Sequence, residues 1–262
     1  MAKRREVMAG MAALPLVAWA AGALAPAFAQ EAGTLDGDRL ATSGGDVIIH
    51  PVSHASLVLG YDDQVIYVDP VGGAELYADL PPPTAVLITH GHGDHFDVPT
   101  LEAIAGGGIP ILTTQEVFDK LPEALKANAT ALANGDEGSL NGLPVAAIPA
   151  YNTSPDRLQY HPQGVGNGYL IKFGDDIVYV AGDTEPTPEM LALENVAVAF
   201  LPMNLPYTMT PEQAAEAVNT FKPGIVYPYH HRGSDLDAFE AAVGEGVEVR
   251  RANWYPEGEE AA

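Results

Sequence analysis

Three imidazoles and a carboxylate lie close together in this chain, at His90, His92, Asp94 and His95, directly after the apolar run 85–88. The run is typical of a buried strand, and α/β enzymes place their chemistry at the carboxyl ends of strands. Imidazole nitrogen and carboxylate oxygen are ligands that zinc, manganese and iron accept. Histidines at i and i+2 of an extended segment point to the same side. The segment therefore predicts a metal site, in preference to a surface loop that binds metal only incidentally.

Composition limits the ligands and the partners. The 262 residues include no cysteine, so disulfides are excluded and a metal must be held by nitrogen and oxygen. The formal net charge is −23, from 12 Lys and Arg against 35 Asp and Glu. A surface this acidic repels phosphate backbones and anionic lipid head groups. We therefore expect a small-molecule substrate and no nucleic-acid partner, while the oligomeric state stays open.

Residues 1–29 are expected to be an export signal peptide of the twin-arginine type. Lys3-Arg4-Arg5 gives a basic start, residues 7–25 are mostly apolar, and Ala27-Phe28-Ala29 is a small-x-small cleavage site. Glycine and proline interrupt the apolar part, so no stable membrane insertion is expected after signal removal; an uncleaved anchor is the alternative. This predicts a periplasmic or secreted protein.

The remaining chain is divided into a flexible linker over 30–45, one domain over 46–256 and an acidic tail over 257–262. The domain contains two series of strand-like apolar runs: 47–49, 56–59, 65–69, 85–89 and 109–113, then 145–148, 168–173, 177–181, 198–202, 225–227 and 247–250. Helical patterns cover 99–105, 115–126, 211–222 and 235–243. Two strand series, each with its own helices, predict an α/β fold with four layers, an αββα sandwich.

Later strands supply the remaining donors of a binuclear centre, which needs about six to eight protein ligand atoms. Asp183 follows the strand 177–181, although a plain turn aspartate would also suit its Gly-Asp-Thr context. His230 and His231 follow the strand 225–227 and should face opposite ways. One of these two histidines is expected to be a ligand.

The motifs Thr89-His90-x-His92-x-Asp94-His95, Gly182-Asp183-Thr184 and Pro228-Tyr229-His230 occur in this order. Together they resemble the metal motifs of the metallo-β-lactamase fold superfamily. Within it, the chain is most similar to the ascorbate-phosphate lactonase-like and N-acyl phosphatidylethanolamine phospholipase D-like hydrolases. Val68-Asp69-Pro70, Tyr207–Thr210 and the loop His161–Gly164 support this resemblance, which covers about residues 47–240.

The resemblance implies two divalent metal ions, zinc first, with manganese or iron as alternatives. It implies a first ion on His90 and His92, a second on Asp94, His95 and His230, and Asp183 bridging both. It also implies that Asp69 hydrogen-bonds within the site and orients the cluster.

Two histidines keep alternative roles. A third histidine for the first ion usually follows a strand such as 145–148, but Pro149–Asn152 contains none. His161 lies in the same loop, where it either completes the first ion's ligands or faces the substrate. His54, between two early strands, either reaches the site or is a hydrogen-bonded structural histidine.

The resemblance further implies a hydrolase that attacks an ester, lactone, amide or phosphodiester with a metal-bridged hydroxide, Asp94 handling the proton. Arg157 and Arg232 lie in loops near the expected site, either as clamps for a carboxylate or phosphate or as ordinary loop arginines. The alternative function is a non-catalytic metal-binding or accessory protein that keeps the fold.

Overall fold

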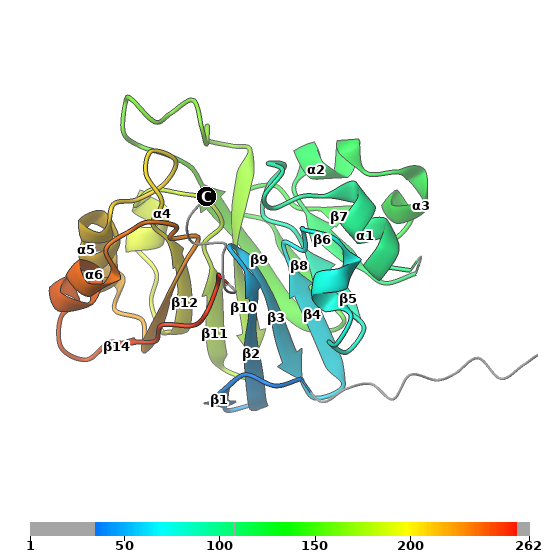
Figure 1. The fold of residues 1–262 in the computed structure, drawn as a ribbon, viewed down its shortest axis with the longest axis horizontal. Coiled ribbons are helices and arrows are strands. Elements are labelled where there is room, and N and C mark those ends of the chain that lie inside the picture. Colours follow the sequence, from blue (N-terminus) through cyan, green and yellow to red (C-terminus); the bar gives the residue numbers. More distant parts are fainter. Residues whose placement is uncertain (1–34, 107, 256–262) are drawn as a thin grey trace, which may run out of the picture. The chain divides into compact units, whose positions relative to one another are not determined.

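The first of two seven-stranded sheets is built from β1 to β7, which lie side by side in chain order in the computed structural model (Figure 1). The structure describes residues 35–106 and 108–255, so the expected signal peptide and acidic tail lie outside the described residues. The strands are β1 Asp38–Thr42, β2 Gly45–Ser53, β3 Ser56–Tyr61, β4 Gln64–Val68, β5 Ala85–Leu87, β6 Ile111–Thr113 and β7 Ala129–Ala131. Neighbouring strands are antiparallel up to β4 and parallel from β4 to β7.

The second sheet repeats this plan with the rest of the chain. Its strands are β8 Glu137–Leu140, β9 Leu143–Ala150, β10 Gly166–Phe173, β11 Asp176–Val180, β12 Val196–Pro202, β13 Ile225–Tyr229 and β14 Glu248–Val249. They again lie in chain order, antiparallel from β8 to β11 and parallel from β11 to β14. The parallel strands in each sheet therefore all end at one edge, which is where βα loops can collect functional side chains.

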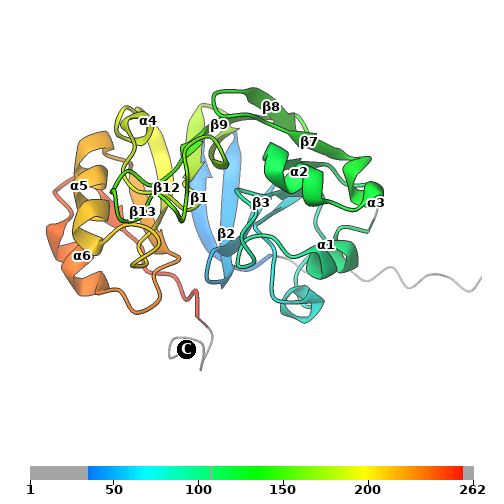
Figure 2. The same cartoon turned by 90° about the horizontal axis from the view of Figure 1, so that it is seen from above.

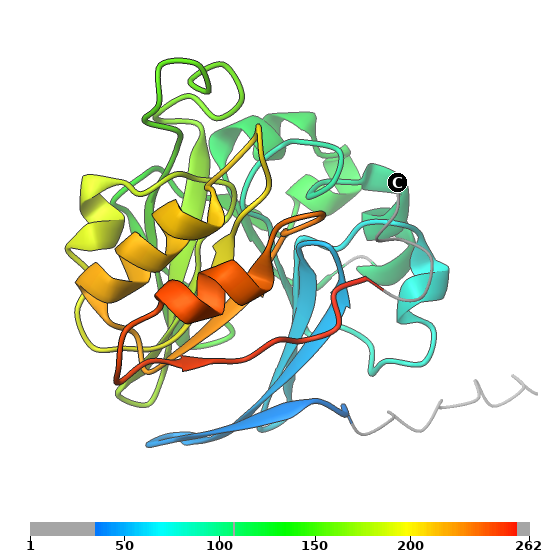
Figure 3. The same ribbon diagram turned by 60° about the vertical axis from the view of Figure 1, so that its left-hand side comes forward.

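Helices cover the outer face of each sheet (Figure 2). The short 3₁₀ helix η1 Ala74–Tyr77 and the helices α1 Val98–Ile104, α2 Gln115–Lys120 and α3 Glu123–Lys126 belong to the first half; α4 Pro188–Leu191, α5 Pro211–Phe221 and α6 Leu236–Ala242 belong to the second. Figure 3 shows α5 and α6 lying along the second sheet. None of the described helices has the length and apolar character needed to cross a membrane.

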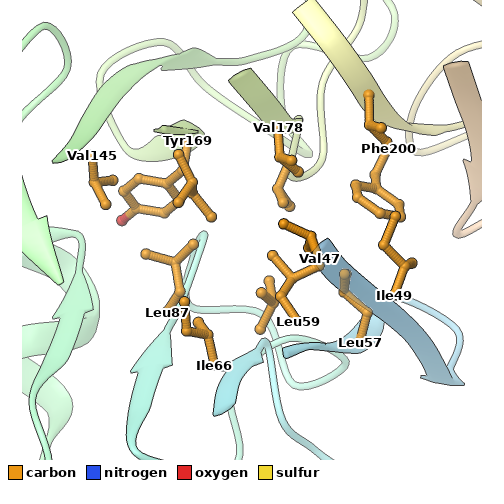
Figure 4. Packing of buried hydrophobic residues seen from close by; sticks show 14 of the residues in the cluster. Val47, Ile49, Leu57, Leu59, Ile66, Leu87, Val145, Tyr169, Val178 and Phe200 are labelled. Carbon is orange, nitrogen blue, oxygen red and sulfur yellow. The ribbon is translucent and has the colours of Figure 1, made fainter. Parts of the chain in front are cut away.

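Three apolar clusters fill the spaces between the layers. One lies between the two sheets, and each of the others lies between a sheet and its own helices. In the inter-sheet cluster, Val47 and Leu59 of the first sheet face Val178 and Phe200 of the second (Figure 4). All four side chains are fully buried, and removing such apolar surface from water is the main drive for stacking the sheets. The predicted four-layer αββα sandwich is confirmed.

Two sequence predictions about elements are wrong. The flexible linker predicted over 30–45 gives way, from Asp38, to strand β1, which pairs with β2 and buries Leu40. Gly44 and Gly45 lie in the hairpin turn between β1 and β2, so this pair indicated a turn and not a linker. The single helix predicted over 115–126 is two helices, because Pro122 offers no backbone N–H and Leu121 before it is extended.

Candidate metal centre

A buried carboxylate, that of Asp69, fixes the histidine cluster by hydrogen bonds. Asp69 follows β4 with φ of 44° and is fully buried. Its Oδ1 accepts the backbone N–H of Thr89 at 2.7 Å, and its Oδ2 accepts the Thr89 hydroxyl at 2.6 Å and the Nδ1–H of His95 at 2.8 Å. The parallel pairing of β4 with β5 brings the two strand ends together. Asp69 thereby fixes the ring of His95 and directs its Nε2 away from the carboxylate.

One group of donors lies on the side of the cluster that faces β9 and β10. The Nδ1 of His92 is 3.1 Å from the Nε2 of His90 and 3.2 Å from the Nε2 of His161. His161 donates its Nδ1–H to the carbonyl of Tyr207 at 3.1 Å, which leaves its Nε2 3.2 Å from Oδ2 of Asp183. The loop between β9 and β10, which rises beyond the sheets in Figure 1, thus brings His161 to the cluster.

A second group lies on the other side of Asp183. The Nε2 of His230 is 3.3 Å from Oδ2 of Asp183 and 3.4 Å from Oδ2 of Asp94. His230 has φ of 44° directly after β13, and its backbone N–H donates to the carbonyl of His54. His54 itself approaches to 3.5 Å between its Nε2 and Oδ2 of Asp94. Three strand ends from two sheets therefore meet at one point.

The charged groups of the centre shift one another's pKa. Burial lowers the pKa of His95, but Asp183 and Asp69 outweigh it and raise that pKa well above its usual value. Burial raises the pKa of the Asp183 carboxyl, but the nearby His230 and His95 outweigh it and hold that pKa well below its usual range. Burial and the charge of His95 lower the pKa of His90 well below its usual value. His90 is therefore neutral, which is the form in which imidazole binds a metal. An ionised central carboxylate among histidines is a typical donor set for a divalent ion.

Three ring or carboxylate atoms show that the residues fit a metal. His95 Nε2, Asp183 Oδ1 and His230 Nε2 are buried and form no hydrogen bond. Buried polar groups in proteins are almost always paired. His95 Nε2 lies 3.3 Å from Oδ1 of Asp183 and His230 Nε2 lies 3.3 Å from its Oδ2, so a cation among these atoms would supply the missing partner. Donor atoms within 4.8 Å of one another form three groups, two of which share His90: His90, His92 and His161; His54, Asp94 and His230; His90, His95 and Asp183.

The hydrogen bonds of His54 favour a role other than direct ligation. The hydroxyl oxygen of Tyr255 accepts the backbone N–H groups of His231 and Arg232, at 3.0 and 2.9 Å. With both lone pairs used, the hydroxyl donates its hydrogen to Nδ1 of His54 at 2.8 Å. The hydrogen of neutral His54 is therefore on Nε2, which faces Asp94. Tyr255 was missed in the sequence, where nothing relates it to a histidine 201 positions earlier.

The two loop arginines do not reach the cluster's cavities. Arg157 Nη1 donates to Glu185 at 2.6 Å, to the Thr208 carbonyl at 2.8 Å and to Gln213 at 2.9 Å. Arg232 lies over the ring of Tyr255, 5.6 Å from its centroid. Neither residue lines the two cavities at the cluster, which favours the alternative of ordinary loop arginines, and the clamp for a carboxylate or phosphate stays a prediction. Arg157 instead ties the loop after β9 to the start of α5.

His231 faces away from the donors, as the alternation of adjacent side chains predicts. Burial lowers its pKa to about 4, and its ring packs edge-on against Tyr255 with centroids 5.0 Å apart. It joins none of the donor groups among the described residues. Of the two neighbouring histidines, only His230 lies with the metal-type donors.

Comparison with known proteins agrees with this geometry. Residues 65–231 match the model of the beta-lactamase superfamily domain, which spans the segment from β4 to the end of the last histidine motif. The chain belongs to this superfamily. The match identifies the superfamily, and it does not distinguish the lactonase-like and phospholipase D-like branch from the others.

Relatives of this superfamily member come from bacteria and archaea. A UPF0173 metal-dependent hydrolase from Deinococcus radiodurans is 33% identical over 180 residues, which is 64% of this chain and 76% of that protein. One from Thermococcus onnurineus is 31% identical over 186 residues, covering 67% and 79%. The crystal structure of a proposed metal-dependent hydrolase from Parabacteroides distasonis has a TM-score of 0.77 at 39% identity, covering 84% of this chain and 99% of that one.

Two cavities adjoin the cluster of metal-type donors in this chain. The larger, of about 570 Å³, has His90, His92, His161 and Asp183 in its wall and extends toward the start of α2 and the chain after β7. The smaller, of about 330 Å³, is lined by Asp94 and His230 and shares His92, His161 and Asp183 with the first. The shared donors therefore separate two cavities, and each cavity has room for part of a substrate.

Proposed function

We propose that this chain is a metal-dependent hydrolase that cleaves an ester, lactone or phosphodiester bond of a small molecule. The observation that carries the proposal is the convergence of His95 Nε2, Asp183 Oδ1 and His230 Nε2, buried without hydrogen bonds, beside open cavities. The names of the Deinococcus and Thermococcus relatives support it.

The proposal includes two divalent ions, zinc first, with manganese or iron as alternatives. His90, His92 and His161 would hold one ion, Asp94, His95 and His230 the other, and Asp183 would lie between them. His161 takes the place of the missing third histidine because its Nε2 faces both His92 and Asp183 at 3.2 Å. The finer branch is part of the proposal, and the two segments named for that resemblance meet where His161 donates to the carbonyl of Tyr207.

The reaction would divide between the ions and the side chains. Divalent ions supply Lewis acidity, which activates water and polarises the bond under attack. Asp94, half exposed at the smaller cavity, would take the proton of the attacking water and return it to the leaving group. The Nε2–H of His54 would hold that carboxylate in place.

The test combines metal analysis with turnover. Metal-replete protein should hydrolyse members of a panel of aryl esters, lactones and phosphodiesters, and Asp94→Ala should abolish turnover. His50→Ala is the matched control, because His50 contacts the carbonyl of Asp36 and none of the donors. Tight metal binding without turnover of any panel member would instead support the non-catalytic alternative.

We also propose that the protein is exported to the periplasm or beyond by the twin-arginine route. The paired Arg4 and Arg5 before an apolar segment support this. Replacing both by lysine should keep the protein inside the cytoplasm in a fractionation experiment. Mature protein outside the cytoplasm at wild-type level would contradict the proposed route.

A further inference from the structure

We propose that the larger cavity receives an uncharged group, so that the enzyme selects substrates with no negative charge beyond the reacting bond. This inference rests on the proposed hydrolytic function. It follows from the residue types that line the cavity, from the ion pairs that Lys120 and Arg157 already form, and from the negative net charge of the chain.

Beyond the ions of the proposed centre, the described residues that line either cavity offer a substrate no lysine or arginine side chain. Apart from the metal-type donors, the charged side chain in the larger cavity is Glu116. The other polar walls come from the amides of Gln115, Asn134, Gln159 and Asn167. A carboxylate or phosphate that lies there beyond the reach of the ions would lose its water without gaining an ion pair with a side chain, which is unfavourable.

The amides are partly committed to the protein. Asn134 donates to the carbonyl of Gly166 at 2.8 Å and to the side chain of Asn167 at 2.7 Å. Asn167 in turn donates to the carbonyl of Leu132 at 2.9 Å. Because both hydrogens of the Asn134 amide are used, what it can offer a substrate is its acceptor oxygen. Such a wall does not provide a site for an anion.

The cation near the cluster is already paired. Lys120 Nζ lies 2.6 Å from Oε1 of Glu116 and 3.4 Å from the carbonyl of Gly91, at the edge of the histidine loop. Arg157 is tied to Glu185, which is fully buried. Moving either cation to a substrate would leave a carboxylate without its partner. The excess of 35 acidic over 12 basic residues adds a field that repels anions.

Apolar side chains at the mouth favour an uncharged group further. Val165 lines the larger cavity and is 37% exposed, and Tyr207 lines the smaller one and is 45% exposed. The ring of Tyr207 packs edge-on against Tyr160, with centroids 5.1 Å apart. Exposed apolar groups beside a cavity indicate contact with an apolar ligand surface.

The experiment compares two esters of the same length with metal-replete protein. 4-Nitrophenyl hexanoate and the 4-nitrophenyl monoester of adipic acid differ in a terminal methyl against a terminal carboxylate. We expect kcat/KM to be at least roughly tenfold higher for the hexanoate, a difference of about 1.4 kcal/mol. Bis(4-nitrophenyl) phosphate should be a poorer substrate than the hexanoate.

Charge variants of one wall residue sharpen the comparison. Gln159 lines both cavities and is exposed, and its amide donates to the carbonyl of Asp156 at 2.8 Å. Gln159→Lys should lower the hexanoate-to-adipate ratio roughly fivefold or more, and Gln159→Glu should raise it. Thr220→Lys, on the exposed side of α5, is the control that adds the same charge elsewhere and should leave the ratio unchanged.

Three outcomes are decisive. A ratio near one, unmoved by either Gln159 variant, overturns the charge selection while leaving hydrolysis standing. A ratio that moves as expected supports it. If no ester, lactone or phosphodiester is cleaved, the proposed function fails, and binding of hexananilide and adipic acid monoanilide, measured by calorimetry, still decides the charge selection: equal affinities overturn it, and weaker binding of the monoanilide supports it.

Discussion

The carboxylate of Asp69 never contacts the cavities, yet three hydrogen bonds from Thr89 and His95 end on it. Asp69→Asn removes the charge that accepts the His95 Nδ1–H, so the ring loses its orientation. We expect the affinity for zinc to fall about 10- to 100-fold, measured by competition with a chromophoric chelator. Asp63→Asn, in the exposed turn before β4, is the control and should bind zinc normally. Unchanged affinity in Asp69→Asn would mean that the backbone alone orients the cluster.

His54 and His230 lie 3.8 Å apart between ring centroids but should behave differently. His230→Ala removes a donor atom, so we expect the metal content per chain to fall. His54→Ala removes the Nε2 that lies 3.5 Å from Asp94, so we expect unchanged metal content and turnover reduced by about 10- to 100-fold. Elemental analysis after identical loading and dialysis decides between them. Equal metal loss in both variants would make His54 a ligand.

The sequence predicts the candidate metal ligands that directly follow apolar strands. His90, Asp183 and His230 carry that signal, because the strand before each is readable from its apolar run. His54 and Tyr255 come together only through the packing of the chain end against the first sheet, with the His54 N–H donating to the Trp254 carbonyl. Local patterns hold no information on such a contact.

At the scale of elements, α5 shows the strongest local signal. Its N-cap Thr210 accepts the N–H of Gln213 at 3.1 Å, and Gln213 accepts the N–H of Thr210 at 3.0 Å. Thr210→Ala should lower the free energy of unfolding by about 1 kcal/mol in urea titrations. Thr220→Ala, near the exposed end of the same helix, should change it less. Equal losses would indicate that the cap contributes nothing beyond the general effect of the substitution.

The sequence does not predict the strands whose apolar patterns are weak. Strand β1 buries one hydrophobic side chain, and β7 and β8 have three and four residues, so alternation is too short to recognise. They form because neighbouring strands supply the pairing partners. The long buried strands β10 and β12 were predictable because their apolar runs bury almost every residue.

At the scale of the whole molecule, the candidate metal ligands join the two halves of the fold. His90 to His95 follow the first sheet, whereas Asp183 and His230 follow strands of the second. Removing metal with a chelator should therefore lower the melting temperature in calorimetry. At free metal of 100 times Kd, the loss corresponds to about 2.7 kcal/mol. Asp183→Asn protein should show a smaller shift, and an unchanged melting temperature in the wild type would contradict the linkage.

The order of the strands also bears on how the chain is made. The first sheet is complete at Ala131, but β10 to β13, which cover its apolar inner face, end only at Tyr229. At roughly 5–20 residues per second, the ribosome needs about 5–20 s for the intervening segment. During that interval the nascent first half presents an uncovered apolar surface, so cellular yield of this protein should depend on chaperones that bind emerging chains.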